Sequence, residues 1–286
     1  MLFRSGMFFT SNITMDQFWW WWVIHLWVEA TWEVFVGVLV AYGLIKVLKA
    51  NRQIVEMWLY IEVTMLFGSG ILGLGHHYFW IGTPEYWWEI GALFSALEPV
   101  PLVGMLVHVI YDMGKHGGKV NNGPAFNWFI VNAFGNFLGA GIWGFMHTLP
   151  QINIYTHGSQ FTAAHGHLAF FGAYASILIG MMYVAIQRKN NIENMRSTST
   201  SKWAISLITI GVVGMTVALT TSGYIQAFVE RGEYGATWDG YFIAQQANWF
   251  LQGIGWRLAM GFVTFVGFLL LVKDMLTISA RSKQLS

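Results

Sequence analysis

Three polar residues at a regular spacing interrupt an apolar stretch near the N-terminus. His25, Glu29 and Glu33 are four residues apart in WWWWVIHLWVEATWE, residues 19–33. On an α-helix this spacing stacks their side chains on one face, one turn above the next. An imidazole and carboxylates on one face suit a divalent transition metal such as iron, zinc or copper. A proton relay or a hydrogen-bonding stripe between helices would use the same residues, so this stretch alone leaves both interpretations open.

The composition around this stretch is that of a membrane protein. Of the 286 residues, 55% are hydrophobic and 10% are charged, and the mean hydropathy is +0.49. Because lipid permits only helices and closed barrels, and no alternating ten-residue strands are visible, we predict an all-α polytopic transmembrane helix bundle. The absence of cysteine excludes disulfides and thiolate-bound metals. The net charge of +1 gives no indication of a nucleic-acid partner.

Seven apolar runs are long enough to cross a hydrocarbon core of about 30 Å. They lie at about 18–45, 55–80, 87–111, 125–147, 160–187, 203–229 and 247–273. We expect residues 1–286 to form a single transmembrane domain. Basic residues gather in alternate loops, for example at Lys46, Lys115 and Arg188. The positive-inside rule therefore predicts a multi-pass protein with its N-terminus outside and its C-terminus in the cytoplasm.

Histidines from three of these runs are expected at one depth in the membrane. A rise of about 1.5 Å per residue puts five of them in the outer half: His25, His76, His77, His165 and His167. Glu98 falls near the midplane of the third run. Ionisable residues inside a membrane are candidates for a functional site, so we expect these residues to act together.

His76 and His77 follow the glycines of GSGILGLG. Adjacent side chains on a helix point about 100° apart. They can converge on one metal if Gly73 and Gly75 loosen the helix end, and otherwise they are an interfacial pair.

His165 and His167, in AAHGH, are two residues apart and therefore lie on opposite flanks of a helix. Opposite flanks imply opposite partners. Two haems, one on each side of the helix, would explain the spacing, because neutral imidazole is a normal axial ligand. Taken alone, His-Gly-His is a weak pattern.

Together these motifs resemble the haem-copper oxidase superfamily, in which one histidine, a histidine pair and a His-x-His lie on three helices. The segments HLWVEATWE, GHHYFWIG, FSALEPVP, LGAGIWGFMHTL and YTHGSQFTAAHGHLAFFGAY look like the large catalytic subunit of cytochrome c-dependent nitric oxide reductases. The match runs from Trp19 to about Tyr183. That subunit has about five further helices on the N-terminal side, so the chain is expected to correspond to the C-terminal helices of the fold.

The resemblance implies a role for each candidate residue. A non-haem iron would take four ligands: His25, Glu29, His76 and His77. His165 would be the axial ligand of a high-spin haem b. His167 would bind a low-spin haem b whose second axial ligand is not in this chain. Glu29, Glu33 and Glu98 would be the catalytic carboxylates that support the iron and deliver protons.

The implied activity is that of an oxidoreductase of denitrification, reducing nitric oxide to nitrous oxide at the haem and the iron. Oxidases of the superfamily typically carry tyrosine where this chain has Glu29, and a carboxylate suits iron better than copper. Terminal oxygen reduction, or an inactive membrane fragment with an empty site, are the alternatives. The implied partners are a cytochrome c-bearing small subunit and a second polypeptide that supplies the other helices. The implied location is the lipid bilayer of the bacterial cytoplasmic (inner) membrane.

Overall fold

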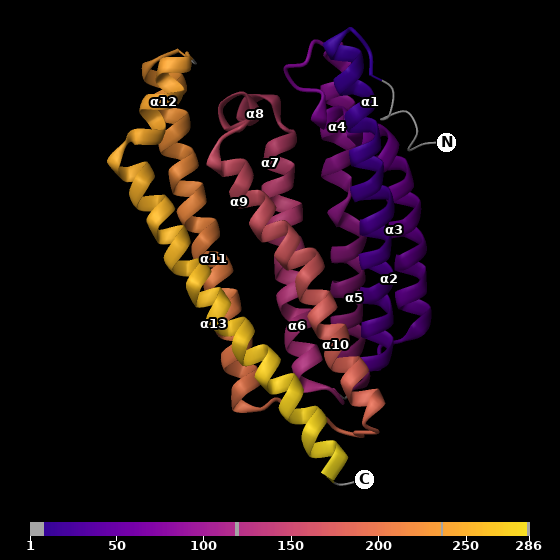
Figure 1. Ribbon diagram of the computed structural model, residues 1–286. Helices are drawn as coiled ribbons and strands as arrows, with labels where there is room; N and C mark the ends of the chain where they lie inside the picture. The colour runs from indigo at the N-terminus through magenta and orange to yellow at the C-terminus, as the bar shows by residue number, and fades with distance from the viewer. Residues whose placement is uncertain (1–8, 118–119, 236, 285–286) are drawn as a thin grey trace. The chain divides into compact units, whose positions relative to one another are not determined.

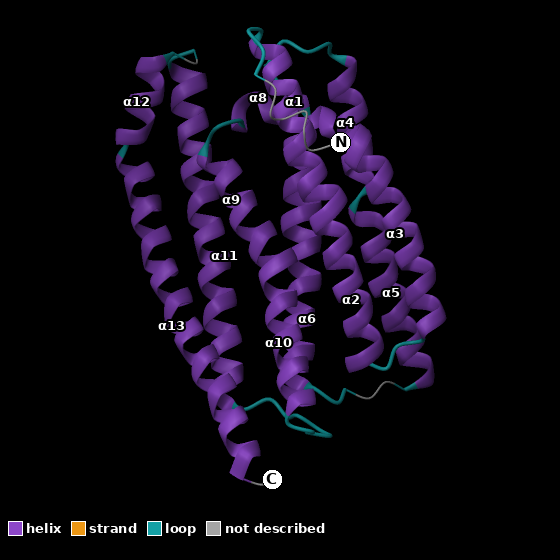
Figure 2. Ribbon diagram, turned by 45° about the vertical axis from the view of Figure 1, so that its right-hand side comes forward, coloured by secondary structure: helices purple, strands orange, loops and turns teal. Residues whose placement is uncertain are grey.

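Helices form every regular element in the part of the chain that the structure describes. The computed structural model describes residues 9–117, 120–235 and 237–284. Within these residues, Figure 2 shows helices joined by loops and no strand. The predicted all-α fold is therefore confirmed.

Seven helical stretches among the described residues are long and apolar enough to cross a membrane. They are Ile13–Val47, Arg52–His77, Tyr86–His116, Gly123–Thr148, Gln160–Lys189, Ser199–Glu233 and Asn248–Ile278. Each end lies within five residues of the end predicted from the sequence. Large apolar side chains such as Leu258 and Phe262 are mostly exposed, at 77% and 67%, as lipid contact allows. The predicted multi-pass membrane protein is confirmed.

The chain divides into two compact units. The first unit contains Met1–Lys46, Ala50–Gly118 and Gly141–Ile154. The second contains Val47–Lys49, Lys119–Ala140 and Tyr155–Ser286. The single transmembrane domain expected from the sequence stays a prediction.

The first unit contains the helices of the first three spans together with α7. They are α1 (Ile13–His25), the π-helical η2 (Leu26–Trp32), α2 (Glu33–Val47), α3 (Arg52–Leu72), the 3-10 helix η3 (Gly73–His77), α4 (Tyr86–Leu97), α5 (Pro99–His116) and α7 (Gly144–Thr148). The short α8 (Pro150–Thr156) follows. Helix α3 contacts η2, α4 and α5. In Figure 1 the ribbon of α2 is drawn between those of α3 and α5, whereas Figure 2 shows α3 and α5 next to each other. The first span is continuous through α1, η2 and α2.

The second unit is built around its two longest helices. Its elements are α6 (Gly123–Gly135), η4 (Asn136–Trp143, whose last residues fall in the first unit), α9 (Gln160–Ala169), η5 (Phe170–Ala175), α10 (Ser176–Lys189), α11 (Ser199–Ala227), η6 (Phe228–Glu233), α12 (Trp238–Gln246) and α13 (Asn248–Gln284). Helix α11 packs along α13 and also contacts α9. Asp274 of α13 is 2% exposed and accepts from Tyr183 Oη at 2.8 Å and from Thr198 Oγ1 at 2.5 Å. This carboxylate therefore joins α10, the start of α11 and α13.

Polar residues cap many of the helices at their N-termini, where the first backbone N–H groups lack partners. The side chains that accept these N–H groups are Asn12, Asn51, Asn122, Ser159, Thr198 and Thr237. Pro99 begins α5, and because proline lacks an N–H the third span is interrupted at Glu98.

Candidate metal centre

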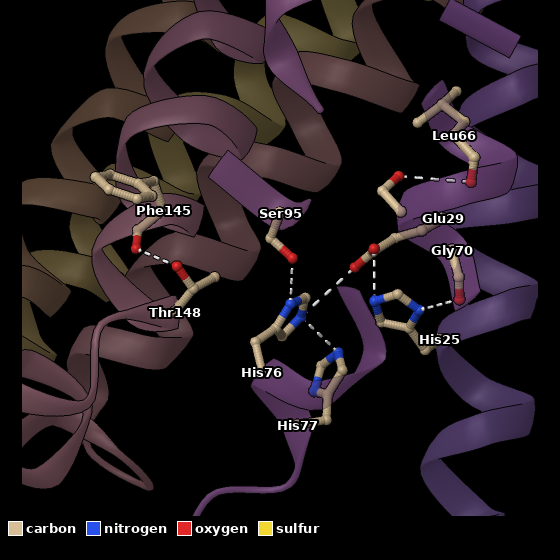
Figure 3. A network of polar contacts seen from close by, with 10 residues as sticks. His25, Glu29, Leu66, Gly70, His76, His77, Ser95, Phe145 and Thr148 are labelled. Atoms are coloured by element: carbon tan, nitrogen blue, oxygen red, sulfur yellow. Dashed lines mark hydrogen bonds and ion pairs between the residues drawn. The ribbon is translucent and has the colours of Figure 1, made fainter. Parts of the chain in front are cut away.

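His25 ends α1 with its side chain buried, at 1% exposed. Its Nδ1 lies 2.9 Å from the backbone oxygen of Gly70 on α3. A carbonyl oxygen only accepts, so Nδ1 donates and the lone pair of the neutral ring lies on Nε2. That Nε2 lies 2.5 Å from Glu29 Oε2 (Figure 3). The hydrogen bond to Gly70 thus fixes the tautomer whose Nε2 can bind a metal ion.

Glu29 lies in η2, the π-helical segment that follows His25. Such π-helical turns within α-helices occur frequently at functional sites. Glu29 is 8% exposed, and neither its Oε2 nor His25 Nε2 makes a hydrogen bond within the described residues. Two acceptor atoms held 2.5 Å apart repel each other unless a proton or a cation lies between them. This pair therefore favours a bound cation or a shared proton.

The adjacent histidines His76 and His77 end the short helix η3. Their Nε2 atoms lie 3.0 Å apart, so the two rings converge (Figure 3). His76 Nε2 lies 3.6 Å from Glu29 Oε1, and its Nδ1 lies 2.5 Å from Ser95 Oγ on α4. The ring of His77 stacks on the indole of Trp21, with centroids 4.3 Å apart. Each imidazole is therefore oriented by a side chain from another helix.

Two glycines make room for η3 against its neighbours. A Cβ atom at Gly75 would collide with the backbone oxygen of Trp87. A Cβ atom at Gly73 would lie 3.1 Å from Ser95 Oγ and 3.2 Å from Glu98 Oε1. The close approach of η3 to α4 therefore depends on Gly75 having no side chain.

Ligand atoms from four residues of the first unit lie within 4.8 Å of one another: His25, Glu29, His76 and His77. In a tetrahedral site with bonds of about 2.05 Å, neighbouring ligand atoms lie about 3.3 Å apart. The separations of 3.0 Å and 3.6 Å around His76 Nε2 are close to that value. Three imidazoles and one carboxylate suit iron, zinc or copper. The donor set and its orphaned acceptor atoms therefore fit a divalent transition metal.

Glu33 and Glu98 lie in the same unit but outside this ligand set. Glu98 stands at the break between α4 and α5, and its Oε1 is buried with no hydrogen-bond partner in the described part of the chain. Glu98 interacts electrostatically with Glu29 and with Glu33. The three predicted catalytic carboxylates therefore form a group in which the charge of one affects the others.

His165 and His167 lie on α9 in the second unit. His165 Nδ1 donates to the backbone oxygen of Gly139 at 2.9 Å, and His167 Nδ1 donates to that of Ala163 at 2.8 Å. When the ring of a histidine that donates from Nδ1 is neutral, its lone pair is on Nε2, which is the atom that an axial haem ligand uses. Apart from the neighbouring residues and backbone of α9 itself, no described heavy atom lies within 4 Å of the position that a Cβ atom would take at Gly166. The tautomers and this open flank fit axial haem ligation.

Other histidines interact with protein groups elsewhere. Trp58 Nε1 donates to His108 Nδ1 at 3.1 Å. His147 Nδ1 donates to the backbone oxygen one turn earlier at 2.9 Å. Burial lowers the pKa of His157, and the nearby Arg231 lowers it further. None of these three belongs to the ligand set found among the described residues.

Three polar groups that lie in or near the candidate site of the first unit were not identified from the sequence. Ser95 is three residues before Glu98, and this helical spacing was a signal that it shares the face of that carboxylate. Glu62 is an isolated carboxylate in an apolar run, which in a membrane helix is itself a signal of function. The carbonyl of Gly70 has no signal, because every residue carries one.

Residues 1–273 match the protein family described as Cytochrome C and Quinol oxidase polypeptide I. The chain belongs to this family. It is 42% identical, over 234 residues and 81% of its length, to a nitric oxide reductase subunit of Stutzerimonas stutzeri. It is 22% identical, over 220 residues and 77% of its length, to a Cbb3-type cytochrome c oxidase subunit of the same organism. The chain spans about half the length of these relatives, 49% and 45% respectively.

A solved structure of another protein shares the fold of this member of the Cytochrome C and Quinol oxidase polypeptide I family. It is a cryo-EM structure of a heme-copper terminal oxidase dimer, with a TM-score of 0.67 and 13% sequence identity. The similarity covers 96% of this chain and 51% of the other. The predicted resemblance to the haem-copper oxidase superfamily is confirmed, and the family implies haem and metal cofactors.

Proposed function

We propose that this protein reduces nitric oxide to nitrous oxide at a high-spin haem b and a non-haem iron, as part of the catalytic subunit of a nitric oxide reductase. The observation that carries the proposal is Glu29, whose carboxylate lies among three imidazoles. A carboxylate in such a set favours iron over copper. The 42% identity to a nitric oxide reductase subunit supports the same substrate.

Each cofactor has its candidate ligands in one unit. The non-haem iron would be held by four residues of the first unit: His25, Glu29, His76 and His77. His165 would bind the high-spin haem b and His167 a low-spin haem b, with the second axial ligand supplied from outside this sequence. Bound in this way, the metals would supply electrons and Lewis acidity for the reduction.

The carboxyl groups near the ligand set provide protons. Two nitric oxide molecules, two electrons and two protons give one nitrous oxide and one water. Carboxylates that share a buried site cannot all be ionised at low cost, because each charge away from water is unfavourable. With Glu29 ionised as a ligand of the iron, Glu33 and Glu98 would therefore hold exchangeable protons beside the site of reduction and pass them on through Glu29.

Partners and location follow from the same proposal. Electrons would arrive from a cytochrome c-bearing small subunit on the outer face. A second polypeptide, or a further segment, would supply the helices that complete the core. The protein would lie in the bacterial cytoplasmic membrane with its N-terminus outside, as the alternation of basic loops indicates.

The test uses the complex purified in detergent and incubated anaerobically with nitric oxide and a reductant. We expect nitrous oxide by gas chromatography, and stoichiometric iron beyond the haem iron by elemental analysis. Glu29→Gln should lower turnover by more than about 100-fold, since even groups that only orient a metal ligand cost about 10- to 100-fold. Glu85→Gln, in an outer loop that is exposed, is the matched control. Stoichiometric copper with little non-haem iron, or equal turnover in the two variants, would contradict the proposal.

Oxygen reduction is the second candidate, favoured by the 22% identity to a cytochrome c oxidase subunit. It predicts oxygen consumption and no nitrous oxide from the same preparation. An inactive protein with an empty site would show neither gas reaction, and would lack haem absorption and non-haem iron.

A further inference from the structure

A further buried carboxyl group lies on α3 of the first unit. Glu62 is 4% exposed and sits in the middle of the span Arg52–His77. Its Oε2 has no hydrogen-bond partner among the residues that the structure describes. An unpaired carboxylate is unfavourable inside a membrane helix, away from water, so this place favours the protonated acid.

The backbone of α2 leaves space for this carboxyl group at one residue. A Cβ atom at Gly37 would collide with Glu62 Oε1, and would lie 2.8 Å from its Cδ and 3.1 Å from its Oε2. Glycine is a poorer helix former than alanine, so helix propensity does not explain its presence in the interior of α2. The carboxyl group of Glu62 therefore rests against α2 at a residue whose missing side chain admits it.

Gly37 continues the spacing of the predicted site residues. Glu29, Glu33 and Gly37 follow one another at four-residue intervals along the first span. Glu33 interacts electrostatically with Glu98 and with Glu62. Carboxyl groups thus extend from the candidate metal centre, along α2, to Glu62.

The position of Glu62 along α3 shows towards which end of the helices this row of carboxyl groups extends. It is eight residues before Gly70, whose carbonyl holds His25, and so about 12 Å along the helix from it. It is ten residues after Arg52, about 15 Å along the helix from the basic loop between α2 and α3. Glu62 therefore lies about halfway between the ligand set and the basic end of the α2–α3 hairpin.

We propose that Glu62 is a proton-transfer residue that carries protons from the Lys46–Arg52 end of the hairpin to Glu33. The protonated Glu62 gives its proton, through an intervening water, to the carboxylate of Glu33. The Glu62 carboxylate then takes a proton from water that enters from the hairpin end. One proton moves per cycle and no electrons are exchanged. This role rests on the proposed function, because the reduction consumes the protons.

The first measurement asks whether Glu62 holds a proton. Infrared difference spectra between the parent complex and Glu62→Gln at neutral pH should show the loss of a carboxylic-acid C=O stretching band that shifts in D2O. Glu56→Gln is the matched control, because Glu56 is on the same helix, partly exposed and paired with Arg52 at 2.6 Å. Absence of a lost band in Glu62→Gln means that Glu62 is ionised, and this result overturns the proposal.

A second variant covers the case in which Glu62→Gln fails to assemble. Gly37→Ala must displace the end of the flexible Glu62 side chain, while the carboxyl group itself remains. We expect the same C=O band to persist at a shifted frequency. An unchanged infrared spectrum in Gly37→Ala would also contradict the proposal.

The third measurement is the rate of proton uptake during a single turnover of the complex in vesicles. Glu62→Gln should slow the uptake by about 100-fold or more and Glu62→Asp by less, with iron content and haem spectra unchanged. If the parent complex forms nitrous oxide and Glu62→Gln matches its uptake rate, the transfer role is wrong and the proposed function stands. If the parent forms no nitrous oxide, the proposed function fails, and with it the transfer role.

Discussion

Replacing Gly75 by alanine separates the geometry of η3 from the chemistry of the histidines that follow it. Gly75 is buried, and its φ is not in the left-handed region, so alanine suits the backbone. The added Cβ atom would collide with Trp87 O and would lie 2.8 Å from Trp87 C and 3.2 Å from Gly91 N. All three atoms belong to the backbone of α4 and cannot rotate away. Either η3 or α4 must therefore move.

The size of the effect follows from these contacts. Forcing an extra methyl group into a packed interior costs typically 1–3 kcal/mol, so we expect a loss of about 2 kcal/mol in stability. Metal–ligand distances tolerate a displacement of only about 0.2 Å, which is less than the shift needed to relieve a contact of 2.8 Å. Because His76 and His77 directly follow Gly75, we expect the affinity for non-haem iron to fall at least tenfold, about 1.4 kcal/mol, and the iron content of the purified complex to fall with it.

The assay is non-haem iron content and the thermal unfolding midpoint of the complex in detergent. The matched control is Gly68→Ala on α3, where no described heavy atom outside the neighbouring residues and backbone of α3 itself lies within 4 Å of the new Cβ atom. Alanine is a better helix former than glycine by about 1 kcal/mol, so this control should keep its iron and its stability. Full iron content and an unchanged midpoint in Gly75→Ala would refute the argument that η3 positions the ligands by close packing.

Two further substitutions test single hydrogen-bond acceptors and donors. Ser95→Ala removes the hydroxyl 2.5 Å from His76 Nδ1 and should weaken iron binding about 10- to 100-fold in a chelator titration. The control Thr64→Ala, at an exposed residue of α3, should leave the iron affinity unchanged. Equal iron affinities in these two variants would contradict the role of Ser95. Asp274→Ala leaves the hydroxyl groups of Tyr183 and Thr198 without their acceptor and should lower the free energy of unfolding by about 2–4 kcal/mol. The control Asp239→Ala, at an exposed residue, should lower it by less than about 1 kcal/mol. Similar losses of unfolding free energy in the two variants would show that the buried carboxylate of Asp274 does not stabilise the fold.

The spanning helices were predictable because lipid leaves the backbone few options. A run of about 20 apolar residues must satisfy its own N–H and C=O groups, and a helix is the way to do so within one segment. Charged residues in the loops then mark where one apolar run ends and the next begins, so the spans can be counted without knowledge of tertiary contacts. Helix ends were less predictable: hydropathy predicts the third run as 87–111, but its helix continues to His116, through Asp112 and Lys115. Charged residues at a helix end can reach water, so hydropathy ends the helix too early.

The local geometry of the candidate site was not predictable from periodicity. The sequence places His25, Glu29 and Glu33 on one face of an ideal α-helix, but the π-helical η2 runs between the first and the last of them. A π-helix adds residues to the turn, so the face that contains Glu33 is rotated from the face expected. Periodicity did not predict η3 either. There the chain changes from the α-helix α3 to a 3-10 helix, and the observation that accompanies this change is the close approach of α4 to Gly75.

Backbone carbonyls, rather than side chains, fix three of the candidate ligand histidines. His25, His165 and His167 each donate from Nδ1 to a main-chain oxygen. For His167 that oxygen belongs to its own helix, whereas the other two reach carbonyls of Gly70 and Gly139 on neighbouring elements. A carbonyl persists whichever residue occupies the position, so no residue type in the sequence reports this orientation. What the sequence does report is glycine at both positions. At Gly139 a Cβ atom would lie 2.8 Å from the backbone of α9, so the small residue brings the two helices close enough for the imidazole to reach.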